Sequence, residues 1–254
     1  NRLGLSSELV KADESSARRF IYHHGKRREL PTGPKTFLTS DIVPWVAKLR
    51  MGMEIFIPVK RDGLDETVYS FGKRRLGTVF AAYLLDPMVS GIFAGNTHEL
   101  SLGAVFPKMV EMESQYGGLF KALIAKGKEA RQTGKKSGGP AGASATLHTF
   151  RNGMGELTST LAAQLGDALQ TSSPVKSLSR QGEGFSIRLQ GEEIDADAVV
   201  LACPSFAAAE VIADLAPQVS AQIGAIRNAP VEVVCHGHRT SDVNCNLNGF
   251  GVLI

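Results

Sequence analysis

A run rich in glycine, lysine and serine divides this chain of 254 residues into two parts with different patterns. The run AKGKEARQTGKKSGGPAGASA covers residues 125–145 and has few side chains that could be buried in a core. Such a composition is typical of a loop at a boundary, and we predict that residues 125–145 form an exposed, mobile loop. The chain is therefore expected to fold in two parts, with helical patterns before this run and alternating helices and strands after it.

The first part begins with a predicted β-hairpin that collects several bases. RRFIYHHGKRRELP, residues 18–31, carries apolar side chains on either side of a probable His-Gly turn. Alternation along a strand places Arg18 and Arg19 on opposite faces, so at most one of them can reach a given pocket. The three bases at the tip, residues 26–28, are expected to be solvated or to lie near anionic lipid headgroups.

Helices are predicted through the rest of the first part. Asp41 is expected to cap a helix that has Pro44 near its start. Residues 63–77 predict a clearer helix, with acids in its first turn, bases in its last turn and Gly77 as the stop. The bases in that last turn are interpreted as complements to the helix dipole and not as a binding patch. Residues 78–125 keep a helical pattern.

The second part predicts an α/β (α+β) arrangement without internal repeats. Its expected elements are a helix over 153–170, strands over 173–180 and 184–189 joined by a glycine-rich turn, a buried strand over 194–204, a helix over 205–215 and a long strand over 229–239.

Composition limits the classes of function. The chain is 43% hydrophobic and its net charge is only +3, so the basic stretch near its start is a local feature. A nucleic-acid binder usually has a broad basic face and a recognisable binding module, and the sequence shows neither. No apolar run reaches the roughly 20 residues that span a bilayer. The richest run, residues 77–95, leaves a peripheral membrane contact open. Three widely spaced cysteines indicate a reducing compartment.

Two local motifs are weak. GMGELT at 153–158 is half of a GxGxxG fingerprint, but no acid ends a strand roughly 20 residues later, so a glycine turn before a helix is the better interpretation. Four side chains, those of Cys235, His236, His238 and Cys245, could in principle bind a metal. Alternation along a strand places Cys235 on the face opposite His236 and His238. The gap to Cys245 is not a zinc-finger spacing, so we expect no metal site.

Five stretches in order resemble the protoporphyrinogen oxidase family, which belongs with the flavin amine oxidases and phytoene desaturases. They are RRFIY followed by RELPTGP, DETVYSFGKRRLG, GIFAGNTHELSLGAVFP, ADAVVLACPSFAAAEVI and GFGVLI. The third stretch is the most specific, and the resemblance covers essentially the whole chain.

The resemblance implies a Rossmann-like flavin-binding domain piece, an inserted helical membrane-binding domain and the start of a mixed-sheet substrate domain. The implied division is 1–14 for the end of a preceding segment, 15–147 for the helical insert, 148–212 for the flavin domain and 213–254 for the substrate domain. The family carries its flavin phosphate loop and a last flavin-contacting segment outside the region matched here. We therefore expect an internal fragment that is inactive and binds flavin weakly or not at all by itself.

The implied activity is oxidation of protoporphyrinogen IX to protoporphyrin IX, with electrons passed to FAD and then to oxygen or another acceptor. The implied location is cytoplasmic and peripheral to the membrane if the source is bacterial, or an organelle membrane if it is eukaryotic. A homodimer is left open.

The resemblance also implies site residues, while the flavin carries the chemistry and no side chain is assigned a catalytic role. The implied substrate contacts are Arg19, which would pair with a propionate, and Gly91, Phe250 and Leu253. The implied flavin contacts are Val175, Ala202, Cys203 and Pro204. Ser90 stands where some members carry a base.

Two alternatives stay open. Another oxidoreductase of the flavin amine oxidase type, such as an amine oxidase or a carotenoid desaturase, would share the VVLACP region but has no reason to carry the FAGN--ELS segment. A non-catalytic membrane-surface module would explain the cations, but it would not explain the α/β second part.

Overall fold

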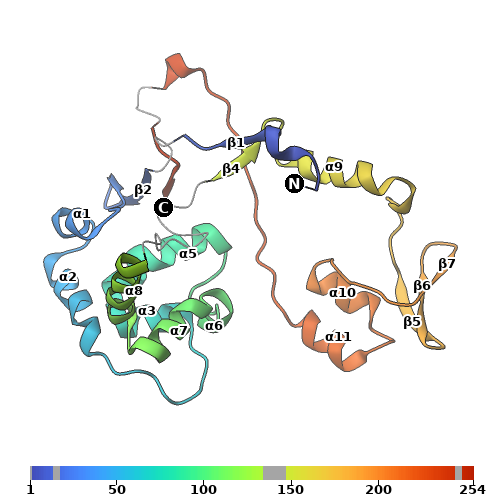
Figure 1. Ribbon diagram of the computed structural model, residues 1–254, viewed down its shortest axis with the longest axis horizontal. Helices are drawn as coiled ribbons and strands as arrows, with labels where there is room; N and C mark the ends of the chain where they lie inside the picture. Colours follow the sequence, from blue (N-terminus) through green and yellow to red (C-terminus); the bar gives the residue numbers. More distant parts are fainter. Residues whose placement is uncertain (1, 14–17, 134–146, 244–247) are drawn as a thin grey trace. The chain divides into compact units, whose positions relative to one another are not determined.

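The computed structural model describes residues 2–13, 18–133, 147–243 and 248–254. The chain divides into two compact units, each described by itself. One unit comprises Asn1–Leu9 and Phe150–Pro230, and the other comprises Val10–Thr149 and Val231–Ile254. We call them the smaller unit and the larger unit. The expected mixture of helices and sheets is confirmed (Figure 1).

The larger unit is mainly helical, as the pattern of its sequence predicts. Its helical elements are α1 (Pro34–Thr39), α2 (Trp45–Gly52), η3 (Met53–Phe56), α3 (Val68–Leu76), α4 (Thr78–Phe80), η4 (Ala81–Leu85), α5 (Asp86–Phe93), α6 (Leu102–Val105), α7 (Pro107–Tyr116), α8 (Leu119–Thr133) and η6 (Thr240–Asp242). Among the described residues, no helix combines the length and the apolar character needed to cross a membrane.

A three-stranded sheet in the larger unit has the order β3-β2-β8. The predicted hairpin is confirmed, because β2 (Arg19–His23) pairs antiparallel with β3 (Lys26–Glu29). On its other side β2 pairs parallel with β8 (Gly251–Leu253), in a register that matches Arg19 with Gly251 and Ile21 with Leu253. This pairing joins the last residues of the chain to the start of the hairpin.

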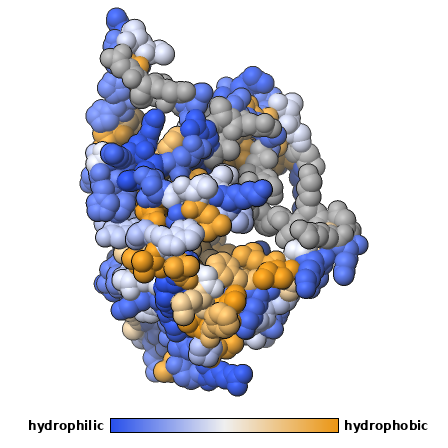
Figure 2. Space-filling view, turned by 90° about the vertical axis from the view of Figure 1, so that its left-hand side faces the viewer, coloured by the Kyte–Doolittle hydropathy of each residue, from blue (hydrophilic) through white to orange (hydrophobic). Residues whose placement is uncertain are grey.

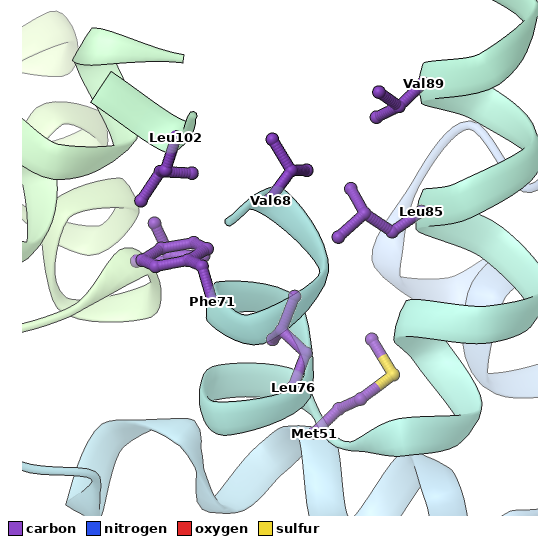
Figure 3. Packing of buried hydrophobic residues seen from close by; sticks show 8 residues of the cluster. Met51, Val68, Phe71, Leu76, Leu85, Val89 and Leu102 are labelled. Carbon is purple, nitrogen blue, oxygen red and sulfur yellow. The ribbon is translucent and has the colours of Figure 1, made fainter. Parts of the chain in front are cut away.

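The helices enclose a hydrophobic core formed mainly by α3 and the segment from η4 to α5. Figure 3 shows Leu85 and Val89 on one helix pointing toward Val68, with Phe71 and Leu102 beyond it. A second cluster under the sheet includes Ile21, and Leu253 packs against it. Both core clusters therefore hold β2, β8 and α5 in one unit.

Two predicted helix starts differ from the observed ones. Helix α2 begins at Trp45 with Pro44 at its N-cap, and Asp41 instead pairs with Arg28, with 2.9 Å between Oδ2 and Nε. Helix α3 begins at Val68, because the Thr67 hydroxyl caps it by accepting a hydrogen bond from the Ser70 amide at 3.1 Å. The acids before Thr67 are therefore outside the helix. Gly77 ends α3 as predicted, at a φ of 97° that favours glycine.

The bases at the end of α3 join an ion network, which the helix-dipole interpretation did not predict. Arg75 is fully buried and lies 3.1 Å from Glu54 and 2.8 Å from Glu113. Arg74 lies 2.8 Å from Glu113 and also pairs with Glu66. This network ties α3 to η3 and α7, so these side chains serve the fold of the larger unit.

The smaller unit contains the predicted helix–hairpin–helix order. Its elements are η1 (Leu5–Glu8), α9 (Gly155–Leu165), η5 (Gly166–Ala168), β5 (Ser177–Gln181), β6 (Gly184–Arg188), β7 (Glu193–Ala196), α10 (Ser205–Val211) and α11 (Pro217–Gly224). Strands β5, β6 and β7 form an antiparallel sheet, and Gly182, at a φ of 59°, forms the predicted turn. A separate two-stranded sheet is formed by β1 (Leu9–Lys11) and β4 (His148–Phe150), most of whose residues belong to the larger unit.

Three predicted segments are wrong in whole or in part. Residues 198–203, expected to be buried strand, are coil; Val199 is half-buried, the other residues are exposed, and Val200 is 89% exposed. Residues 229–239 are also coil. No described strand lies beside either segment, so their apolar patterns have no backbone partner within the described chain. Residues 125–133 continue helix α8 and are not a loop, because alanine, lysine, glutamate and arginine favour helix. Residues 134–145 of the predicted loop lie outside the described residues.

Candidate functional site

Arg18 and Arg19 make different contacts, as strand alternation predicts. Arg18 binds the carboxylate of Glu29 through Nε at 3.0 Å and Nη2 at 2.6 Å. The hydrogen bond and the negative charge of Glu29 raise the pKa of Arg18. Arg19 is exposed and forms no ion pair with any described residue. It is therefore the guanidinium of this pair that remains available for a ligand carboxylate.

An aromatic ring lies next to Arg19. The Arg19 guanidinium carbon is 5.8 Å from the centre of the Phe250 ring, and Phe250 is 61% exposed. The Phe250 amide donates a hydrogen bond of 2.7 Å to the Arg18 carbonyl, which fixes the start of β8 beside β2. The parallel register of β2 and β8 thus explains why the Arg19 guanidinium and the exposed Phe250 ring lie next to each other.

Gly251 leaves the surface beside Arg19 open, and Gly91 leaves room for the Leu253 side chain. A Cβ on Gly91 of α5 would lie 2.7 Å from Cδ2 of Leu253, so a side chain there would force Leu253 to move. A Cβ on Gly251, the register partner of Arg19, would meet nothing within 4 Å. Gly251 is a candidate site residue that our sequence reasoning missed, although it stands next to Phe250 in the GFGVLI stretch.

Arg27 and Arg28 of the hairpin have other partners. Arg28 pairs with Asp41, and the Arg27 guanidinium carbon lies 4.7 Å from the centre of the Phe20 ring. Strand alternation puts Phe20 on the face opposite Arg19. Ser90, beside Gly91, donates its hydroxyl to the Gly95 carbonyl at 3.3 Å and brings no charge. Among these bases, Arg19 is the one that adjoins Phe250.

The structure therefore brings together the four predicted substrate residues: Arg19, Gly91, Phe250 and Leu253. They combine a cation that has no ion pair among the described residues, an exposed aromatic ring and, beside them, open space at Gly251. Such a surface suits a flat apolar ligand with an anionic rim, since a guanidinium binds a carboxylate through two parallel hydrogen bonds. Their role as substrate contacts stays a prediction.

The four predicted flavin residues all lie in the smaller unit. Val175 is 40% exposed on coil before β5, and Ala202, Cys203 and Pro204 are exposed just before α10. Helix α10 contacts β5, so the two groups belong to neighbouring elements. Their small or apolar side chains leave the backbone accessible to a ligand.

These positions line neither of the two cavities described in the structure. The cavity described in the smaller unit is lined in part by Asp195 and Asp197, whose carboxylates would repel a pyrophosphate. The flavin contacts therefore stay predictions. The exposure of the four residues and their small or apolar side chains support them.

The cysteines and histidines considered as metal ligands lie near the end of the chain. Cys235, His236 and His238 lie on exposed coil, and the two imidazole centres are 6.3 Å apart. Cys245 lies outside the described residues. Within the described ranges, no three cysteine, histidine or acidic side chains are grouped so that they could hold a metal ion.

Comparison with known proteins defines the class. Residues 1–244 match the family model described as flavin containing amine oxidoreductase, and the chain belongs to this family. The resemblance inferred from the five stretches is therefore confirmed at the level of the family, and the family implies a flavin cofactor.

Curated relatives of the chain are named as porphyrinogen oxidases. The chain is 29% identical over 262 residues to coproporphyrinogen III oxidase of Propionibacterium freudenreichii, covering 90% of this chain and 48% of that protein. It is 29% identical over 262 residues to protoporphyrinogen oxidase of Homo sapiens, covering 100% of this chain and 54% of that protein. The chain thus spans about half the length of the curated relatives it matches.

A solved structure supports the fold. The crystal structure assigned as a protoporphyrinogen oxidase from Exiguobacterium sp. 255-15 has a TM-score of 0.60 and 21% sequence identity to this chain. The match covers 85% of this chain and 46% of the other. The chain therefore shares its mixed helical and sheet fold with that protein.

Proposed function

We propose that the protein containing this chain oxidises protoporphyrinogen IX to protoporphyrin IX with FAD as its cofactor. The single observation that carries the proposal is Arg19, which has no ion pair among the described residues, beside the exposed ring of Phe250. The names of the relatives support the substrate class, since they include protoporphyrinogen and coproporphyrinogen oxidases.

In this proposal the described side chains bind and orient the substrate. Arg19 holds one propionate by two parallel hydrogen bonds, which fixes the direction of the macrocycle as well as its charge. Phe250 and Leu253 pack against the apolar tetrapyrrole, Gly91 leaves room for Leu253, and Gly251 leaves room for the edge of the macrocycle. A bound flavin would accept the electrons in successive two-electron steps, and oxygen or another acceptor would reoxidise it.

The flavin contacts proposed for the smaller unit are the backbone near Val175 and the segment Ala202–Pro204. Their exposure supports this assignment, because a backbone group can bind a ligand only where no side chain covers it. No step of the reaction is assigned to these side chains.

A second candidate substrate is coproporphyrinogen III, which carries additional propionates. Curated relatives from Propionibacterium freudenreichii and Bacillus subtilis, the latter 26% identical over 265 residues, are named coproporphyrinogen III oxidase. Among the described residues of the site, Arg19 is the one guanidinium without an ion pair, which favours the substrate with fewer propionates.

A fluorescence assay on the full-length protein tests the proposal. Porphyrin fluorescence should rise faster than spontaneous oxidation allows after addition of protoporphyrinogen IX, and the purified protein should show the absorbance of a bound flavin. The ratio of kcat to KM for the two porphyrinogens then identifies the preferred substrate. A flavin-loaded protein that accelerates neither reaction would refute the proposal.

A further inference from the structure

The aromatic ring of the candidate site lies at the surface of the larger unit. Phe250 is 61% exposed, and its ring centre lies 5.8 Å from the Arg19 guanidinium carbon. Figure 2 faces the side of Figure 1 on which α1, α2 and β2 lie, and exposed apolar side chains gather there among hydrophilic ones. An exposed ring has few neighbouring side chains to fix its direction. The direction of the Phe250 ring therefore depends mainly on the backbone that carries it.

The backbone at Phe250 departs from the strand that follows it. Strand β8 begins at Gly251, and residues 249 and 250 form a bend. If β8 began earlier in the same register, Phe250 would pair with Arg18 and share its face, which is the face opposite Arg19. The register thus decides which residues are neighbours, and the bend allows the Phe250 ring to lie beside Arg19.

A buried ring lies directly against this bend. Phe20 of β2 is only 8% exposed. A Cβ on Gly249 would lie 2.6 Å from Cε2 and 3.3 Å from Cδ2 of the Phe20 ring. Two carbons that are not bonded to each other do not approach to 2.6 Å in a packed protein. A side chain at position 249 would therefore force either the bend or the Phe20 ring to move.

The Phe20 ring has little room to move. The guanidinium carbons of Arg18 and Arg27 lie 5.3 Å and 4.7 Å from its centre. Arg18 in turn is held by two hydrogen bonds to the Glu29 carboxylate. Because the ring is buried and bordered by these cations, a side chain at position 249 would displace the bend.

The bend also carries the hydrogen bond that ties Phe250 to β2. The Phe250 amide donates to the Arg18 carbonyl at 2.7 Å. A Cβ on Gly249 would lie 3.4 Å from that same carbonyl oxygen. Displacement of the bend would therefore weaken this hydrogen bond and carry the Phe250 ring away from Arg19.

We propose that Gly249 is a positioning residue, which lets the bend close on Phe20 and thereby holds the Phe250 ring beside Arg19. The effect on substrate binding rests on the proposed function, in which Phe250 packs against the tetrapyrrole. Gly249 is the first residue of the GFGVLI stretch, and our sequence reasoning did not name it as a site residue.

Hydrogen exchange in the full-length protein tests the positioning without any reaction. In Gly249→Ala the Phe250 amide should exchange roughly tenfold faster, because its hydrogen bond to Arg18 is weakened. Mass spectrometry of a peptide that contains Phe250 measures the rate. Gly52→Ala in α2 is the matched control, since a Cβ there would meet nothing within 4 Å. It should leave the exchange of this peptide unchanged.

A second substitution separates close contact from a general loss of stability. Phe20→Leu removes Cε2, the atom that a Cβ on Gly249 would meet first. Compared with Phe20→Leu alone, the double variant with Gly249→Ala should show much less acceleration than Gly249→Ala shows in the wild type. Circular dichroism checks that all variants keep their helix content.

Kinetics of the full-length protein show whether the position of the ring matters to the substrate. Gly249→Ala should raise the KM for protoporphyrinogen IX about tenfold, because Phe250 loses part of its packing on the macrocycle. The effect on kcat should be smaller. A loss of folded protein alone would instead lower the apparent kcat and leave the KM unchanged. In the Phe20→Leu background, Gly249→Ala should raise the KM much less.

Three results would overturn the inference. The first is unchanged exchange of the Phe250 amide in Gly249→Ala. The second is equal acceleration with and without Phe20→Leu. The third, in a protein that oxidises porphyrinogen, is an unchanged KM in Gly249→Ala. If the wild type oxidises neither porphyrinogen, the proposed function fails, and the exchange measurements alone decide whether Gly249 positions Phe250.

Discussion

Arginine side chains in the larger unit differ in what balances their positive charge. This difference distinguishes arginines that stabilise the fold from one that is available to bind a ligand. Arg75 is fully buried between Glu54 and Glu113, and Arg18 lies in an exposed pair with Glu29. Arg19 has no carboxylate partner among the described residues and lies beside Phe250. A guanidinium that is exposed and unpaired can bind an external anion without first losing an internal partner.

The first prediction concerns Arg19. In the full-length protein, Arg19→Ala should raise the KM for protoporphyrinogen IX about 10- to 150-fold, with a smaller effect on kcat. A propionate at the rim of the macrocycle makes the same contact before and during oxidation, so its loss weakens binding uniformly. Arg19→Lys should recover part of the loss, because it keeps the charge without the two-point geometry.

Arg27→Ala is the control for Arg19→Ala, since Arg27 is also a base of the hairpin but stacks on Phe20. It should change the KM little. An equal rise in KM for Arg27→Ala would mean that the hairpin acts as a diffuse electrostatic patch, and the assignment of Arg19 would be withdrawn.

The second prediction concerns the buried ion network. Glu54 accepts hydrogen bonds from Arg75 and from the amides of Leu119 and Phe120, at 2.8–3.1 Å. Glu54→Gln removes the negative charge and leaves the buried Arg75 less compensated, so the free energy of unfolding should fall by about 3 kcal/mol. Glu29→Gln, in an exposed pair, should have little effect. Urea denaturation measures both, and similar losses would argue against a structural role for the network.

The third prediction concerns pH. Burial alone would raise the pKa of Glu113, but hydrogen bonds from Arg74, the Lys60 amide and Arg75 outweigh it and hold this pKa at about 2. An unfolded glutamate has a pKa of about 4.3, so Glu113 stabilises the fold above that pH and loses this effect as the pH falls toward 2. In Glu113→Gln, the free energy of unfolding should depend less steeply on pH across this window. An unchanged slope would contradict the assignment.

At the scale of elements, the close approach of α3 and η4 depends on a glycine. A Cβ on Gly72 would lie 2.3 Å from Cδ2 of Leu85, which is itself buried in the core. Gly72→Ala should therefore lower the free energy of unfolding by about 1–3 kcal/mol through overpacking.

Gly127→Ala in α8 provides the opposite case, because a Cβ there would meet nothing within 4 Å. It should raise the free energy of unfolding by about 1 kcal/mol through helix propensity. Thermal denaturation of both variants measures the contrast. Two changes of the same sign would show that the packing between α3 and η4 is looser than the structure indicates.

Elements defined by neighbouring residues could be predicted from the sequence, whereas elements that need distant partners could not. The β2–β3 hairpin and the Gly77 stop follow from local turn chemistry. The strand predicted at 229–239 has the right residue types, but no described neighbour pairs with it. The local pattern around Asp41 predicts a helix cap, whereas Asp41 forms an ion pair with Arg28. That ion pair is a tertiary contact, which a local pattern does not contain.

At the scale of the whole molecule, the candidate site is assembled from segments that are far apart in the chain. Arg19 comes from β2, Gly91 from α5 and Phe250 from the residue just before β8. Residue spacing alone does not predict that these residues lie close together, and the family resemblance is what implies them as site residues. The parallel β2–β8 register supplies the physical reason for their proximity.

The most direct test of the central claim, that Arg19 binds a substrate carboxylate, combines a variant with a modified substrate. The KM is measured in the full-length protein for protoporphyrinogen IX and for its dimethyl ester, which has no free carboxylate, with wild type and with Arg19→Ala. We predict that the ester raises the KM of the wild type strongly and that Arg19→Ala adds little further, because both changes remove one contact. If the effects of the ester and of Arg19→Ala were additive, Arg19 would not be the residue that binds the propionate.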